Sequence, residues 1–276
     1  MPGPDLTVNT DGNPWVEVFI DPSDLDPATV TLRMYRLSEG RTWLVRGGVD
    51  VAPGVAALDF EVPFGVESAY RAEMFDVDGV SLGFTDTTST WVDVEGTWVH
   101  NPLDPTVAVQ LVNLSGSAET LTRQTPGEVV YVEGASVGRR ISSRRRGLEG
   151  VPVRLLAESR DVADTLQAML GSYETQQVPV LCIRTSEAIR WPRTFFASTQ
   201  ELVEREKDVH SGGELVQFEA SMDEVAPPFP GLVVPLLTYD DLDEFHGTYT
   251  AMDAAYASYT EKDRDYSLAG FAGSGA

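Results

Sequence analysis

Short runs of alternating apolar and polar residues, separated by turn residues, constrain the fold of this chain more than any other feature. Tyr70, Ala72 and Met74 fall on one face of such a run, opposite Arg71 and Glu73. This alternation is typical of a half-buried strand, and turn signals recur roughly every 8 to 12 residues, as they do in β-sandwiches. The sequence therefore predicts a mainly β fold that begins with a β-sandwich over residues 1–100.

A stiff proline-containing segment, residues 101–105, predicts the boundary to a second domain, residues 106–236. Most of this region again favours strands, but residues 159–171 predict one helix. Ser159 is a suitable N-cap, apolar residues follow at helical spacing, and Gly171 ends the pattern. Strands with one covering helix indicate a β-rich α+β domain.

The C-terminal segment, residues 237–276, contains three consecutive decamers built on one template. Each copy begins with threonine or serine followed by tyrosine, and carries aspartate at its sixth position. The spacing of capping residues predicts short helical turns, and ten residues are too few to bury a face alone. We therefore expect the decamers to pack on the protein or on a neighbouring subunit. Their aromatic residues are candidate subunit contacts: Tyr239, Phe245, Tyr249, Tyr256, Tyr259 and Tyr266.

A formal net charge of −23 limits the partners that the chain can bind. An acidic surface repels phosphate backbones and anionic headgroups, so we expect no nucleic-acid partner and no membrane insertion. No apolar stretch approaches the ~20 residues that span a bilayer, and the sequence shows no secretory signal, so we expect synthesis in the cytoplasm. Cys182 lies in an apolar run and is interpreted as a buried structural thiol.

Residue patterns for catalysis or metal binding are weak. His100, His210 and His246 are far apart in sequence and have no partner at zinc-ligand spacing. Residues 76–79 are similar to the start of a calcium loop, but the later ligands are missing, and Asp78-Gly79 instead predicts a type I′ hairpin turn. We therefore expect no metal, no cofactor and no enzymatic activity. A glycosidase, which needs two carboxylates across a cleft, is the enzyme class that remains as an alternative.

Five arginines within eight residues stand out in this acidic chain: Arg139, Arg140, Arg144, Arg145 and Arg146. Guanidinium groups pair well with carboxylates, which are plentiful here. We interpret the segment as a loop that docks on an acidic face of a neighbouring subunit. A flexible, solvated loop is the main alternative. Contact with nucleic acid is a weaker one, because interleaved aromatic residues are lacking.

Several stretches resemble known protein families. Residues 62–76, with Tyr70 at the position of the tyrosine corner, resemble the E–F corner and F strand of fibronectin type III domains. Four stretches are similar in their order to distal-tail and tail-tip proteins of long-tailed bacteriophages that infect actinobacteria: residues 96–105, the run 150–155 before the helix, residues 179–181 and residues 191–193. The Thr-Tyr decamers are of a kind that such proteins often carry.

The resemblance implies a minor tail protein, a ring or collar subunit of the virion tail tip that binds the tail tube and baseplate partners. It implies a structural protein that assembles with itself, as a ring or trimer, and with other phage tail proteins. The alternative is a host-adhesion protein, in which exposed aromatic residues such as Trp43 or Trp91 line a glycan site.

Overall fold

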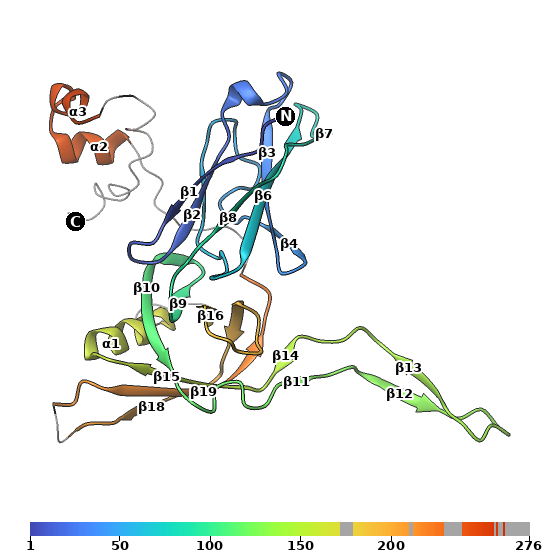
Figure 1. The fold of residues 1–276 in the computed structure, drawn as a ribbon. Helices are drawn as coiled ribbons and strands as arrows, with labels where there is room; N and C mark the ends of the chain where they lie inside the picture. Colours follow the sequence, from blue (N-terminus) through green and yellow to red (C-terminus); the bar gives the residue numbers. More distant parts are fainter. Residues whose placement is uncertain (172–178, 210–211, 229–238, 257, 259–261, 263–276) are drawn as a thin grey trace. The chain divides into compact units, whose positions relative to one another are not determined.

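The computed structural model describes residues 1–171, 179–209, 212–228, 239–256, 258 and 262. The chain is mainly β, as its sequence predicts, and forms two units, residues 1–232 and residues 233–276. The first unit holds two large hydrophobic cores, one in an N-terminal sandwich and the other in a β-barrel (Figure 1).

The N-terminal sandwich consists of two sheets that share one core. In one sheet β2 lies between β1 and β5, and in the other β3 lies between β4 and β6, while β7 and β8 both pair with β6. Val16, Leu32 and Met74 are among the inward residues that fill the space between the sheets. The expected sandwich is thus confirmed, and the resemblance to fibronectin type III stays a prediction. Its elements are β1 (Asp5–Asn9), β2 (Trp15–Phe19), the 3-10 helix η1 (Pro22–Asp24), β3 (Thr31–Ser38), β4 (Arg41–Leu44), β5 (Ala57–Asp59), β6 (Glu67–Phe75), β7 (Ser81–Phe84) and β8 (Thr88–Trp91).

The turn before β7 differs from the type I′ turn that the sequence predicts. Gly79 has a φ of 74°, whereas Asp78 does not have a positive φ, and a type I′ turn requires both central residues to be left-handed. The Asp76 carboxylate accepts hydrogen bonds from the backbone N–H groups of Asp78 (2.9 Å) and Val80 (2.8 Å). The carboxylate therefore holds the turn, and the extra side-chain bonds favour this geometry over the expected one.

A six-stranded antiparallel barrel follows, with the strand order β15-β10-β9-β16-β17-β19 closed by pairing of β19 with β15. Alternate residues of β15, namely Val151, Val153 and Leu155, are buried in the barrel core. The seventh strand of the sheet, β18, pairs with the first half of β19. The strands are β9 (Thr97–Asn101), β10 (Asp104–Asn113), β15 (Val151–Ala157), β16 (Val180–Thr185), β17 (Thr194–Ser198), β18 (Leu202–Glu206) and β19 (Val216–Glu224).

The proline-containing segment at residues 101–105, where the sequence predicted a connector between domains, spans the end of β9, a tight turn and the start of β10. β9 pairs with both β10 and β16, so it belongs to the barrel. Val92 lies in the sandwich core and Val99 in the barrel core. The chain therefore crosses from one core to the other a few residues earlier than expected, because Pro102 lies in a turn of the barrel and Pro105 within β10.

The helix α1 (Arg160–Met169) of the barrel forms where the sequence predicts it. Ser159 Oγ accepts a hydrogen bond from the Val162 N–H (3.3 Å), and Leu166 is buried against the barrel. At the other end, Asn101 Nδ2 donates to the carbonyl of Met169 (2.9 Å). A strand residue thus satisfies one of the carbonyl groups that a helix C-terminus leaves without an intrahelical partner.

The second unit contains two short helices, α2 (Tyr239–His246) and α3 (Tyr249–Ala255), which correspond to the first two decamers. Thr248 caps α3 by accepting a hydrogen bond from the Ala251 N–H (3.2 Å). Leu242 and Met252 form a small apolar cluster with Tyr256, so these two copies pack on each other. Most of the third decamer, including Tyr259 and Tyr266, lies outside the described residues. In the described part of the chain, no helix is long and apolar enough to cross a bilayer.

Candidate functional site

A two-stranded arm leaves the barrel between β10 and β15 (Figure 1). Next to the barrel, β11 (Thr122–Arg123) pairs with β14 (Leu148–Glu149). Farther out, β12 (Gly127–Val130) pairs with β13 (Arg139–Ser142), and every residue of these two strands is exposed. Within the arm, residues 122–149, the strand β13 forms in the segment 139–146 that the sequence predicted as a loop. The hairpin of the arm forms because Val129 and Val130 are strand-forming residues.

The five arginines of the predicted contact are all exposed on this arm: Arg139 and Arg140 lie in β13, whereas Arg144, Arg145 and Arg146 lie between β13 and β14. Arg140 donates a hydrogen bond to the carbonyl of Thr125 (2.8 Å), and Arg146 forms an exposed ion pair with Glu149 at 3.5 Å. Neither contact buries charge. The other three arginines form no ion pair within the described residues: Arg139, Arg144 and Arg145.

The arm also exposes large apolar side chains. Tyr131, Val137 and Ile141 are 67%, 76% and 62% exposed. A Cβ atom on Gly138 would lie 2.4 Å from Val129 Cγ1 and 3.0 Å from the Tyr131 ring, so the tyrosine lies across the glycine backbone. Paired residues share a face, so Val129 and Arg140 lie on one side of the ribbon, and Val130 and Arg139 lie on the other. Both faces therefore combine apolar and cationic groups.

Charge on the arm is opposite to that of the chain. Between residues 123 and 146 there are six arginines and two glutamates, in a protein with a net charge of −23. A lone two-stranded hairpin is at best marginally stable in water, and its edges offer unpaired backbone groups. An arm with these properties can bind an acidic surface that also covers its apolar residues.

Three of the aromatic residues predicted as subunit contacts are exposed on the helices of the second unit. Tyr239, Phe245 and Tyr249 are 61%, 51% and 69% exposed. Tyr256 instead lies within the unit, where its hydroxyl is 3.2 Å from His246 Nε2. The role of the exposed three as subunit contacts stays a prediction.

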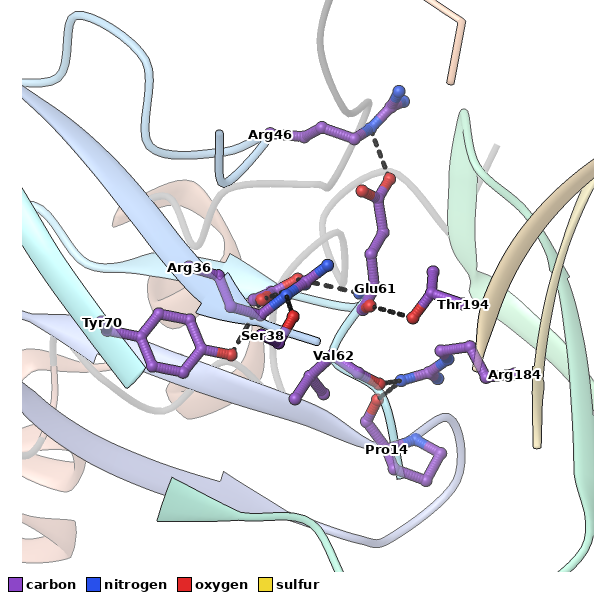
Figure 2. Close-up of polar contacts among 10 residues, drawn as sticks. Pro14, Arg36, Ser38, Arg46, Glu61, Val62, Tyr70, Arg184 and Thr194 are labelled. Carbon is purple, nitrogen blue, oxygen red and sulfur yellow. Dashed lines mark hydrogen bonds and ion pairs between the residues drawn. The ribbon is translucent and has the colours of Figure 1, made fainter. Parts of the chain in front are cut away.

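Sequence reasoning missed a buried polar network at the junction of sandwich and barrel (Figure 2). Arg36 and Asp59 form an ion pair at 2.5 Å, and both side chains are 2% exposed. The Tyr70 hydroxyl donates to the same carboxylate (2.8 Å). Tyr70 therefore bonds to an acidic side chain, whereas a tyrosine corner directs its hydroxyl to the backbone. The sequence feature that could have predicted this network is the presence of charged residues at strand positions that face inward.

Arg184 links the two cores. It extends from β16 of the barrel and donates to the carbonyls of Pro14 (2.8 Å) and Val62 (3.2 Å), both in the sandwich (Figure 2). Its guanidinium carbon lies 4.5 Å from the centroid of the Phe64 ring. Thr194 of β17 makes a second link by donating to the carbonyl of Glu61 (2.8 Å). These contacts fix the sandwich against the barrel and hence against the base of the arm.

Glu61 makes the stability of this junction dependent on pH. Burial raises the pKa of its carboxyl group to about 7, although Arg46 at 2.8 Å favours the ionised form. The folded protein therefore binds the proton of the Glu61 carboxyl group more tightly than the unfolded chain does. This contribution to stability is fully present below pH ~4.5 and is lost as pH rises through ~7. Relative to a Glu61→Gln variant, the wild type should lose about 1–3 kcal/mol of unfolding free energy between pH 5 and pH 8. Urea denaturation at both pH values measures this, and parallel pH profiles would contradict it.

Other reactive groups lie in the interior. Cys182 is fully buried, as predicted, and burial raises the pKa of its thiol. His100 is fully buried too, and burial together with the positive charge of Arg184 lowers its pKa well below the usual range. His210 lies outside the described residues. Among the described residues, no group of His, Cys, Asp and Glu has the arrangement of a metal site.

Trp43 and Trp91, the residues of the glycan alternative, do not form a row. Trp43 packs against the cluster of Val180, Cys182 and Phe196, whereas Trp91 is 56% exposed. They lie on β4 and β8, which are separated in the sheet by β3 and β6.

No protein-family model matches this chain, and a search of curated proteins finds no similar sequence. The function therefore has to be inferred from the arm, the net negative charge of the chain and the junction.

Proposed function

We propose that this protein is a structural, non-catalytic subunit of a bacteriophage tail tip or baseplate. It assembles with itself as a ring or collar through the arm, joins the tail tube and other tail proteins, and belongs to the virion after synthesis in the host cytoplasm. The observation that carries the proposal is the arm, a cationic hairpin with apolar residues exposed on both faces of an acidic protein. Such a surface is stabilised when a partner covers it.

The distribution of titratable groups supports a structural role. Glu61, His100 and Cys182 are among the groups with strongly shifted pKa values, and all three are buried. The others, Arg36, Tyr70 and Arg184, are buried too. A catalytic group has to reach its substrate, and these serve packing and orientation instead. A tail-tip position is supported in addition by the sequence stretches that resemble tail proteins and occur in the same order.

Replacing the five arm arginines (Arg139, Arg140, Arg144, Arg145 and Arg146) with serine should weaken self-association by about a hundredfold. Two desolvated charge pairs of ~1.5 kcal/mol each are sufficient for this effect. Light scattering coupled to size-exclusion chromatography measures it, and 1 M salt should weaken wild-type association because the Debye length falls to ~3 Å.

A control variant removes positive charges outside the arm. Arg41→Ser, Arg190→Ser and Lys207→Ser remove three exposed positive charges outside the arm, and this variant should associate like the wild type. Unchanged association of the five-serine variant would refute the proposal. So would a wild-type monomer that binds duplex DNA through the arm.

A further inference from the structure

The surface that receives the arm has to offer carboxylates, and the hairpin of β18 and β19 is the most acidic part of the barrel sheet. Residues 201–224 contain eight carboxylates and only two lysine or arginine residues. This hairpin and the arm are parts of the same unit, yet their charges are opposite. One chain therefore carries two complementary surfaces.

A groove of about 700 Å³ lies over this hairpin, between β15, β19 and the turn that joins β17 to β18. Its lining contains three carboxylates, Glu201, Glu219 and Asp223, against one cation, Arg154, and its apolar residues include Pro152 and Val203. Volumes of this order hold a drug-sized ligand, and hence several side chains of a docked peptide. The groove is thus complementary to the arm: its carboxylates can pair with the arginines of the arm, and its apolar residues can contact the exposed apolar side chains.

The carboxylates of the groove differ in how far they are already paired. Glu219 lies 3.4 Å from Arg205 and 4.0 Å from Arg154, and Asp223 accepts a hydrogen bond from the Gly150 N–H (2.8 Å). Glu201 is exposed, and its carboxylate has no ion pair within the described residues. Arginines of an incoming segment can therefore pair with Glu201 and add to the partial contacts of the other two.

The arm of the same chain does not reach this groove. Gly150, at the base of the arm, forms one end of the groove. Arg140 is eight residues from the arm base at Leu148, so an extended hairpin places it roughly 25 Å away at ~3.3 Å per residue. Contact with its own groove would require the arm to fold back on itself.

We infer that the acidic groove of one copy receives the arm of a second copy, which makes the interface of the proposed assembly head-to-tail. The inference rests on the proposed function, since it assumes that the arm binds another copy. A head-to-tail contact uses two different surfaces of each subunit, and it closes into a ring when the rotation between subunits allows. The arm and the groove are those two surfaces.

Charge-reversal variants of the groove and of the arm test this inference independently of the proposed function. The groove variant Glu201→Lys/Asp223→Lys and the arm variant Arg139→Glu/Arg140→Glu should each weaken self-association at least about tenfold, and their combination in one chain should recover much of the loss. The control Glu204→Lys/Glu206→Lys makes the same charge change on alternate residues of β18, which do not line the groove, and should associate like the wild type. Sedimentation velocity gives the association constants, and circular dichroism verifies folding.

The outcomes are distinct. If the arm variant dissociates while the groove variant assembles normally, the groove is not the receiving surface, although the proposed function stands. If the arm variant also assembles normally, the proposed function fails. Recovery in the combined variant excludes misfolding as the cause of the single-side losses.

Engineered cysteines provide a second test, because the natural Cys182 is buried. Mixing a Val137→Cys protein with a Gln200→Cys protein should give a disulfide-linked heterodimer under mild oxidation, since these positions lie at the arm tip and in the groove. A chain carrying both changes should form interchain links. A disulfide formed only within that monomer would show that the arm docks in its own groove and would overturn the inference.

Discussion

Replacing Asp59 with alanine should lower the free energy of unfolding by about 3–5 kcal/mol, because it leaves a buried guanidinium without its counterion. Arg36 is 2% exposed and bonds Asp59 through one nitrogen, at 2.8 and 2.5 Å from the two carboxylate oxygens. Tyr70 would lose its acceptor as well. Urea denaturation followed by tryptophan fluorescence measures the change.

The control for this prediction is Asp50→Ala. Asp50 pairs with Arg33 at 2.7 Å, but the two side chains are 55% and 42% exposed, so this loss should cost no more than about 1 kcal/mol. A double variant, Arg36→Met/Asp59→Leu, removes both buried charges and should recover part of the stability. Equal effects of the two alanine substitutions would contradict the assignment of Arg36 and Asp59 as a buried pair that stabilises the sandwich.

Arg184→Met should cost about 3 kcal/mol and separate the unfolding of the sandwich from that of the barrel. Arg184 donates to three acceptors in the sandwich, the carbonyls of Pro14 and Val62 and the side chain of Asn13. Methionine fills similar space but leaves these acceptors without a donor, at ~1 kcal/mol or more for each. Calorimetry should then show two transitions where the wild type shows one.

The exposed Arg41 serves as the control for Arg184, since its side chain is 57% exposed. Arg41→Met should leave a single transition at nearly the wild-type temperature. A single, unshifted transition in Arg184→Met would show that the sandwich and the barrel are coupled by other contacts.

Local sequence signals predicted the elements that depend on local interactions. Ser159 and Gly171 bound the α1 helix because capping involves neighbouring residues only. Closure of the barrel requires β15 to pair with β19, and Val151 pairs with Met222 across a long stretch of chain. Periodicity within a strand does not specify its partner, so the sequence indicated strands with one helix and not a barrel.

The arm was recognised by its chemistry and misjudged in its structure. The arginine cluster at residues 139–146 was visible in the sequence, but it was interpreted as a loop. The hairpin depends on pairing of residues 127–130 with residues 139–142. The groove and the junction escaped prediction for a similar reason, since Arg184 and Asn13 are 171 residues apart in sequence.

The mass of the wild-type protein in solution tests the central claim most directly. Native mass spectrometry over a range of concentrations at low salt should show one dominant species at a fixed multiple of 30.1 kDa. That species should disappear when the five arm arginines are replaced with serine. A wild-type protein that stays at 30.1 kDa at every concentration would contradict assembly through the arm.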